Sequence, residues 1–456
     1  KRAGNVVAKL HQNGNRFDIE IKTNATDGEM KEANSGGTVV SGAMRCPACG
    51  KSTPISVLRR DRTDENGNTL YGLRRWEKGE FEPCPTDVFQ ERLYAVRYEH
   101  TEIYPNGKTK TTRYYRAPNE RDMENEEKVR KLAAENLAEW QAQGLVPSME
   151  IEIGLEIERL NKERGWTHWN HLFNARQLYV LSRFMEQVAK EPSQMLKVVG
   201  MLGINKCADF GSDLCRWNPN CDKTEQTFYN QAFNTMMNWG VRSLTMLSTL
   251  WFRISEPYPM KRDGSVVLSD AKDVEEKCDF WITDPPYADA VNYHELSEFF
   301  LAWDKHLLQE AFPEWYTDSK RVLAVKGDEH FSQSMIEIYS NLAAHMPEDG
   351  MQIVMFTHSD PAVWAQLALI MWKAGLKVTA AWNIATETDA SGLKDGNYVK
   401  GTVLLVLRKQ CGDDEAFLDE LNSVIKAEVK NQIESMQALD DKEDPNFADP
   451  DYVLAA

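Results

Sequence analysis

The chain has 456 residues, of which 42% are hydrophobic and 27% charged, and its formal net charge is −17. This length allows two or three domains with a sizeable core, and the acidic balance argues against a free-standing nucleic-acid binder, which is usually basic. Residues 1–116 nevertheless carry 20 Lys and Arg against 15 Asp and Glu, whereas residues 411–456 carry 3 against 13. A basic N-terminal region is therefore still compatible with phosphate contacts.

Apolar residues and cysteines indicate the compartment. No apolar stretch approaches the length of a membrane span, and no charged-then-apolar leader precedes residue 50. The eight cysteines are mostly scattered singly, which fits a reducing compartment better than a disulfide scaffold. We therefore expect a cytoplasmic protein without a membrane segment.

The first 116 residues predict a β-rich region that includes a candidate metal knuckle. Residues 5–10 and 16–23 read as strands joined by a Gln-Asn-Gly-Asn turn, which suits a hairpin. Cys46 and Cys49 follow at knuckle spacing, and Gly50 permits a tight turn around a tetrahedral ion. Structural zinc needs four ligands, so one pair leaves open both a zinc site and a degenerate ribbon without metal.

A basic and aromatic segment occupies the rest of this region. Arginine and aromatic side chains can together follow a DNA backbone and stack on bases, so the segment is a candidate for target recognition. A solvated surface with intermixed acidic residues explains the same pattern. The candidate DNA-binding residues are Arg59, Arg60, Arg74, Arg75, Lys108, Lys110, Arg113 and Arg116.

The remaining chain predicts three further parts. Residues 117–205 have helical apolar spacing and predict a helical insertion. Residues 206–410 predict an α/β region, and residues 411–456 predict an acidic helical tail. In the α/β region we expect strands at 278–283, 351–357, 377–382 and 402–407, and helices at 293–303, 334–346 and 362–374.

The most informative motif is Asp284-Pro285-Pro286-Tyr287, which lies between an expected strand and an expected helix. A carboxylate and a backbone carbonyl that accept both N–H bonds of an aromatic amine can orient its nitrogen toward a methyl sulfonium. Proline fixes φ and donates no N–H, so such a turn can aim carbonyls into a site. Tyr287 offers a face on which a flat ring stacks. A plain proline-rich turn remains the alternative interpretation.

Two further groups of residues are candidates for substrate binding. Asn292, Tyr293 and His294 follow the motif directly and are expected to line the pocket for the base. His358 follows an expected strand end, which is where doubly wound sheets place their ligands. A hydrogen-bonded loop histidine is the alternative interpretation for His358.

With these pieces, the chain resembles the zinc-ribbon-containing, adenine-specific DNA methylases, amino-methyltransferases with an N-terminal domain of unknown function. The similarity extends from the motif through residue 293 and the expected helix after it. It also covers residues 46–50, 172–178, 214–217, 356–359 and 382–387. The resemblance implies a Rossmann-like class I methyltransferase sheet, of which the four expected strands are the catalytic half.

The resemblance also implies an activity. The chain is expected to be an S-adenosylmethionine-dependent enzyme that forms N6-methyladenine on a base flipped out of double-stranded DNA. Asp284 and the Pro285 carbonyl would hold the amine, Tyr287 would stack on the adenine, and Asp284 would also lie at the cofactor. Members of the family resemble parts of restriction-modification or phage-defence systems, so an ATPase or helicase subunit is an expected partner.

One part of the family pattern is missing from the sequence. No Phe-x-Gly-x-Gly turn that would cradle S-adenosylmethionine is present, and residues 209–212 are only the nearest approach. A half-sheet would leave an apolar strand with an open edge. We therefore expect the cofactor loop to lie in a preceding part of a longer protein. The rival hypotheses are a non-catalytic DNA-recognition or scaffold subunit, and an amino-methyltransferase that acts on RNA.

Overall fold

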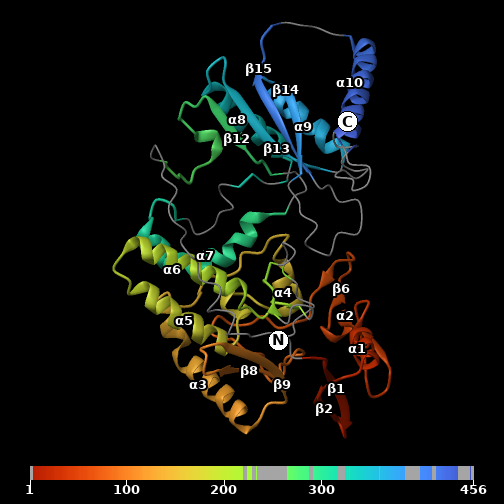
Figure 1. Ribbon diagram of the computed structural model, residues 1–456, viewed down its shortest axis with the longest axis vertical. Coiled ribbons are helices and arrows are strands. Elements are labelled where there is room, and N and C mark those ends of the chain that lie inside the picture. Colours follow the sequence, from red (N-terminus) through yellow and green to blue (C-terminus); the bar gives the residue numbers. More distant parts are fainter. Residues whose placement is uncertain are drawn as a thin grey trace. The chain divides into compact units, whose positions relative to one another are not determined.

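The structure of this chain is a computed structural model. It describes residues 4–218, 223–228, 233, 264–286, 291–316, 324–325, 327, 329–358, 360–385, 401–412, 417–439 and 452. The chain divides into two compact units, Lys1–Gly264 with Asn292–Lys320 and Ser265–Val291 with Arg321–Ala456. The described residues form a mixed α/β structure (Figure 1), as the sequence predicts. Across these ranges, no helix combines the length and the apolar character needed to cross a membrane.

The first unit begins with the expected hairpin. Strands β1 (Val6–Asn13) and β2 (Arg16–Thr23) pair antiparallel around a turn in which Gly14 has a φ of 59°. Helix α1 (Asp27–Ser35) follows. The ammonium groups of Lys9 and Lys22 each lie 2.6 Å from the same Oε1 of Glu29, which ties α1 to the hairpin.

The region up to residue 116 is β-rich, as predicted. The short elements after α1 are β3 (Val39–Val40), β4 (Ala43–Arg45), β5 (Ser52–Pro54), α2 (Ile55–Leu58), β6 (Arg62–Thr63) and β7 (Thr69–Leu70). A second long hairpin pairs β8 (Val96–Ile103) with β9 (Thr109–Arg116). Tyr98 and Tyr114 are cross-strand neighbours whose rings stack at 5.4 Å, and aromatic pairs of this kind stabilise a hairpin.

Helices form the rest of the first unit. They are α3 (Glu120–Ala142), α4 (Glu158–Arg164), the 3₁₀ turn η1 (Trp169–Leu172), α5 (Ala175–Ala189), α6 (Gln194–Asp209) and α7 (Tyr293–Ala311). The short strands β10 (Trp217–Asn218) and β11 (Lys223–Thr224) follow α6. The predicted helical part, residues 117–205, is interrupted by segments without helix, among them residues 151–157 and 165–168. Gly165, with a φ of 76°, ends α4 because it adopts the left-handed conformation that other residues disfavour.

Aromatic side chains fill the core of this helical part. Trp169, Phe173, Phe299 and Trp303 are each at most 2% exposed. The rings of Phe173 and Trp303 lie 5.1 Å apart edge to face, and those of Phe173 and Phe299 stack at 5.7 Å. These aromatic side chains therefore belong to the hydrophobic core.

The second unit contains a four-stranded mixed sheet in the order β12-β13-β15-β14 (Figure 1). The strands are β12 (Phe280–Thr283), β13 (Met351–Phe356), β14 (Leu376–Ala385) and β15 (Gly401–Lys409), and all four were expected from the sequence. Strands β12 and β13 are parallel, whereas β15 runs antiparallel to both of its neighbours. The turn η3 (Ala271–Asp273) precedes the sheet, and helix α10 (Leu418–Leu439) follows it.

One face of this sheet is packed and the other is open. Helices α8 (Phe331–Ala344) and α9 (Pro361–Lys373) pack with Val354, Phe356 and Leu407 in a common core. Side chains alternate along a strand, so the residues next to these three in each strand point to the face away from α8 and α9. There Ile282 is 67% exposed and Trp382 is 65% exposed.

Candidate active site

The Asp284 motif lies at the carboxyl end of β12. Asp284 is exposed, Pro285 is buried and Pro286 is exposed, whereas Tyr287 lies outside the described residues. Thr283, the last residue of β12, places its Oγ1 3.0 Å from the Tyr339 hydroxyl. The motif therefore places an exposed carboxylate between the partly buried Thr283 and the buried Pro285.

The prolines are backed by a closely packed wall. Pro286 borders a cavity of only about 10 Å³, which leaves room for no more than one water. Helices α8 and α9 and strand β13 supply the other side chains that line it, which are Phe331, Met335, Phe356, Val363, Gln366, Leu367 and Ile370. This cavity is too small for a nucleobase, and its walls restrict how far the turn can move.

His358 lies at the same edge of the sheet as Asp284. Both residues follow the carboxyl ends of the parallel strands β12 and β13, whose register pairs Thr283 with Val354. The His358 Nδ1 accepts the backbone N–H of Asp360 at 2.9 Å, and its carbonyl accepts the Trp364 Nε1–H at 2.9 Å. These bonds match the alternative interpretation, a histidine that helps to order a loop, since Asp360 is the N-cap of α9.

The other candidate base-pocket residues lie at the start of α7, in the first unit. Asn292 is the N-cap, and its backbone N–H donates to Glu156 Oε1 at 3.3 Å. Tyr293 is 57% exposed, and the His294 ring lies 4.0 Å from the Glu295 carboxylate. Their predicted contact with the base stays a prediction, because Asp284 belongs to the second unit.

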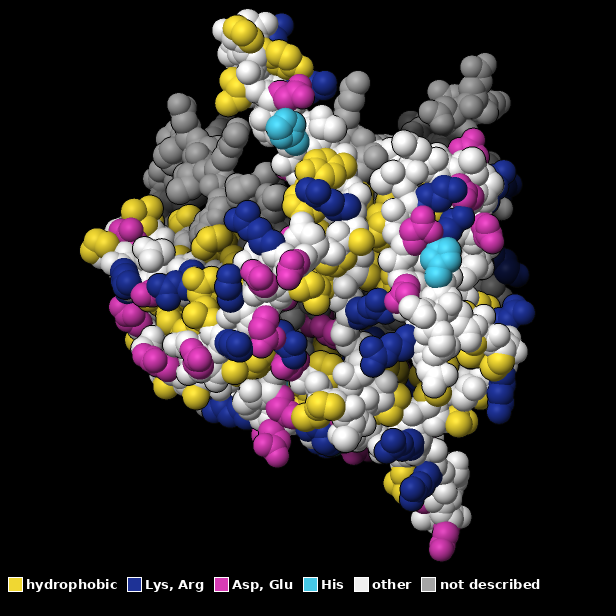
Figure 2. Space-filling model, turned by 90° about the horizontal axis from the view of Figure 1, so that it is seen from below, with side chains coloured by type: hydrophobic (Ala, Val, Ile, Leu, Met, Phe, Trp, Pro, Cys, Tyr) yellow, Lys and Arg dark blue, Asp and Glu magenta, His cyan; other side chains and the backbone are white. Residues whose placement is uncertain are grey.

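Carboxylates neighbour much of the basic segment. Arg59 binds Asp61, Arg113 binds Glu99, and Lys110 lies 3.8 Å from Glu102. On the face drawn in Figure 2, Lys and Arg side chains alternate with Asp and Glu. This pairing favours the alternative interpretation, a solvated surface, for those three residues.

Three other members of the segment have different surroundings. Arg60 and Lys108 are exposed. The Arg116 guanidinium lies 4.3 Å from the centre of the Tyr98 ring and 5.4 Å from that of Tyr114. A cation over an aromatic pair on a hairpin is a surface on which bases can stack.

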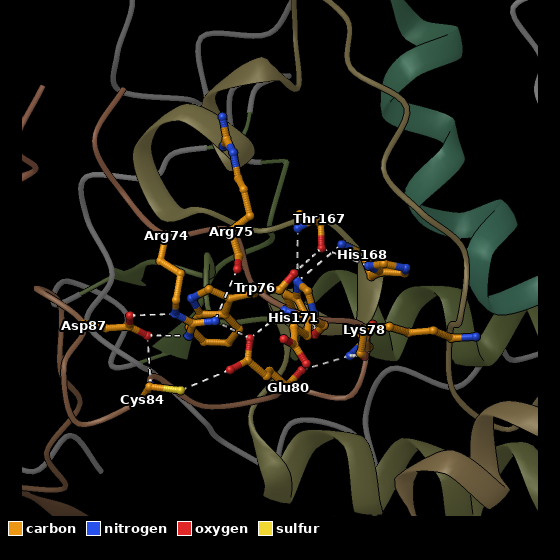
Figure 3. A network of polar contacts seen from close by, with 12 residues as sticks. Arg74, Arg75, Trp76, Lys78, Glu80, Cys84, Asp87, Thr167, His168 and His171 are labelled. Carbon is orange, nitrogen blue, oxygen red and sulfur yellow. Dashed lines mark hydrogen bonds and ion pairs between the residues drawn. The ribbon is translucent and has the colours of Figure 1, made fainter. Parts of the chain in front are cut away.

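Arg74 belongs to a polar network that the sequence did not reveal (Figure 3). Its guanidinium binds Glu80 at 2.7 Å and Asp87 at 2.8 Å, which raises the pKa of Arg74 well above its usual value. The Cys84 thiol donates to Glu80 Oε1 at 3.1 Å, and this contact raises the pKa of the thiol. A protonated thiol is a poor metal ligand.

His171 anchors this network to the helical part of the unit (Figure 3). Its Nε2 lies 2.9 Å from the Glu77 carbonyl, and its Nδ1 accepts the backbone N–H of Thr167 at 3.1 Å. Burial lowers the pKa of His171 to about 4, so the ring is neutral at physiological pH. Arg75 also contacts the helical part, through the Asn161 carbonyl. The network is structural, because it joins residues 74–87 to η1 and α4.

The cysteine pair forms a turn between β4 and β5. Gly50 has a φ of 72°, and its N–H donates to the Cys46 carbonyl at 2.8 Å. The backbone N–H groups of Cys49 and Ala48 lower the pKa of the Cys46 thiol. This arrangement favours a thiolate, the form that binds zinc. Within the described ranges no three His, Cys, Asp or Glu side chains meet to hold an ion, so zinc at Cys46 and Cys49 stays a prediction.

The nearest approach to a cofactor loop has a different role in the structure. Asp209 is the last residue of α6, and residues 210–212 form the turn that ends this helix. A Cβ atom at Gly211 would lie 2.8 Å from the Cys207 carbonyl oxygen. A glycine-rich loop for a cofactor follows a strand, and this segment follows a helix. It therefore does not fit S-adenosylmethionine.

Comparisons of the chain with protein-family models, with curated proteins and with solved structures return no match.

Proposed function

We propose that this chain provides the amine-binding site of an S-adenosylmethionine-dependent methyltransferase that forms N6-methyladenine in DNA. The observation that carries the proposal is the exposed Asp284 carboxylate at the carboxyl end of β12, with a buried proline directly after it. This edge of a sheet is where α/β enzymes bind their ligands.

The sheet supports the same proposal. In β12-β13-β15-β14 the last strand that the structure describes, β15, lies antiparallel between two earlier strands. The resemblance implies that the four strands of this sheet are the catalytic half of a class I methyltransferase sheet. The motif also follows the first strand of this half, β12, which has a parallel neighbour in β13.

The chemistry assigned to these residues is positioning. A carboxylate has acceptor sites on two oxygens, and the Pro285 carbonyl supplies another acceptor, so together they can accept both N–H bonds of an exocyclic amine. The nitrogen lone pair then points along one fixed direction. Holding a nucleophile in this way contributes through orientation and through dipoles that are already in place. No strong base is required, because the methylated ammonium loses its proton readily.

S-adenosylmethionine would supply the methyl group when bound. No described segment of the chain forms a glycine-rich turn after a strand, and so we assign no described residue to hold the adenosyl or methionine part. The target adenine would be flipped out of the duplex at a cost of roughly a few kcal/mol. Arg60, Lys108 and Arg116 are the basic side chains that we propose for the DNA backbone.

The test is methylation of host DNA by the full-length gene that encodes this chain. We expect modified-base sequencing to find N6-methyladenine at one sequence motif with the wild type and none with Asp284→Ala. The matched control is Asp279→Ala, which removes an exposed carboxylate just before β12 and should leave methylation unchanged. Equal methylation in wild type and Asp284→Ala, or no methylation in either, would overturn the proposal and favour an RNA substrate or a recognition subunit.

A further inference from the structure

A hydrogen-bonded pair of hydroxyl groups, that of the partly buried Thr283 and that of the buried Tyr339, lies directly beside the Asp284 motif. Tyr339 is 1% exposed and belongs to the core formed by α8, α9 and the sheet. Its hydroxyl lies 3.0 Å from Oγ1 of Thr283, which is the residue before Asp284. A phenol hydroxyl in a protein core needs a hydrogen-bond partner, because an unsatisfied one is costly. Thr283 meets this need, and in return Tyr339 fixes the end of β12.

The same helix also contacts the other side of the motif. Phe331, Met335 and Tyr339 are spaced four residues apart and therefore form one row along α8. Phe331 and Met335 line the small cavity that Pro286 borders. One row of α8 thus holds the residue before Asp284 at one end and the proline turn after it at the other.

The Tyr339 hydroxyl is suited to hold Thr283 through a hydrogen bond, and it is not suited to exchange protons. Burial raises the pKa of Tyr339 to about 12, and the nearby negative charge of Asp284 contributes to this shift in the same direction. The phenol is therefore neutral at any pH at which an enzyme of this kind works. It remains a hydrogen-bond partner of Thr283 throughout that range.

We infer that Tyr339 is a positioning residue for Asp284, which it holds in place through the Thr283 hydroxyl. The inference deepens the proposed function and rests on it, because the value of a fixed Asp284 lies in orienting an amine. A shift of about 1 Å in such a group is enough to reduce turnover strongly. Tyr339 itself touches no substrate in this scheme.

Four variants of the full-length gene product test the inference. Tyr339→Phe and Thr283→Val each remove one hydroxyl with little change of shape, and Thr283→Ser keeps the hydroxyl. Ser332→Ala is the matched control, because it removes a different hydrogen bond of α8, the one that Gln366 donates at 2.9 Å. The two readouts are hydrogen exchange of peptides that cover residues 280–286 and steady-state methylation of duplex DNA.

We expect Tyr339→Phe and Thr283→Val to speed exchange in residues 280–286 and to lower kcat by about tenfold, the equivalent of one hydrogen bond. KM for DNA should stay unchanged, since the hydroxyl pair does not touch substrate. The double variant should lose no more than either single variant, because both changes break the same contact. Thr283→Ser and Ser332→Ala should behave like the wild type in both readouts.

The two readouts separate this inference from the proposed function. Unchanged exchange in Tyr339→Phe and Thr283→Val would overturn the inference, whatever the activity. Faster exchange with unchanged kcat would also overturn it, because Asp284 would then need no fixed support. If the wild type transfers no methyl group, the proposed function is overturned, and the exchange data alone decide whether Tyr339 fixes Asp284.

Discussion

Asp304 on α7 is a buried carboxyl whose surroundings oppose its ionisation. One oxygen accepts the Asn205 Nδ2–H at 2.8 Å, and the other has no hydrogen-bond partner among the described residues. Burial raises the pKa of Asp304 to about 7, above the usual value near 4. The exposed Asp284 and the buried Asp304 are therefore opposite cases, since only the first is placed to meet a ligand.

The raised pKa of Asp304 leads to a prediction about how the free energy of unfolding depends on pH. Between about pH 4 and pH 7 the folded protein keeps this proton while the unfolded chain has lost it, so the free energy of unfolding falls as pH rises through that window. Asp304→Asn retains an acceptor for Asn205 and cannot ionise. We expect this variant to be more stable than the wild type at pH 8, and to lose its advantage near pH 4. Urea unfolding at both pH values measures this difference.

The control for this prediction is Asp279→Asn, because Asp279 is an exposed carboxyl. That variant should follow the wild type at both pH values. If Asp304→Asn and the wild type differ by the same amount at pH 4 and pH 8, then folding does not raise the pKa of Asp304 and the prediction is wrong.

Helix α7 is held at its first turn by a loop that precedes α4. The Glu156 backbone N–H donates to Glu295 Oε2 at 2.9 Å, while the Glu156 carboxylate accepts the Asn292 N–H. Gly154 permits this approach, since a Cβ atom there would lie 2.2 Å from the carboxyl carbon of Glu295. Glu295 is only 4% exposed, so its carboxylate has little space to move away.

We therefore expect Gly154→Ala to destabilise the protein by about 1–3 kcal/mol, the usual cost of overpacking. The lowered midpoint of urea unfolding would show this effect. Gly79→Ala is the control, because a Cβ atom at Gly79 meets no atom within 4 Å. Equal midpoints for the two variants would show that the loop adjusts and does not hold α7.

The helices and strands show how much of the structure the sequence patterns predict. Apolar spacing predicted the strands of the second unit and helices α7, α8 and α9, with bounds that differ by a few residues. Its largest error is the end of α7, which runs eight residues beyond the predicted end at residue 303. The polar residues after Trp303 obscure the pattern there, because Asp304 is buried although aspartate is usually a surface residue.

Contacts between distant residues could not be predicted in the same way. The sequence placed Asp284 after a strand, and the structure agrees. Thr283 meets Tyr339 across 56 residues, and Arg74 meets Asp87 in a loop without regular structure. Such pairs follow from packing and leave no local periodic signal. The ion pair between Arg176 and Glu126, which are 50 residues apart, is another such contact.

The molecule as a whole consists of two compact units with separate cores. Leu178 of α5 lies in the first and Leu407 of β15 in the second, and both are fully buried. The second unit also exposes apolar side chains such as Ile282 and Trp382 on its open sheet face. A large exposed apolar surface lowers the stability that a small sheet can reach, because less of its apolar area is removed from water.

This organisation predicts that unfolding is not a two-state process. Leu178→Ala and Leu407→Ala should each cost about 2–5 kcal/mol, but in different units. Calorimetry of the wild type should then resolve two transitions. Leu407→Ala should lower the temperature of one transition and leave the other unchanged, and Leu178→Ala should do the reverse. A single transition that both variants shift equally would show that the two units unfold together, as one cooperative body.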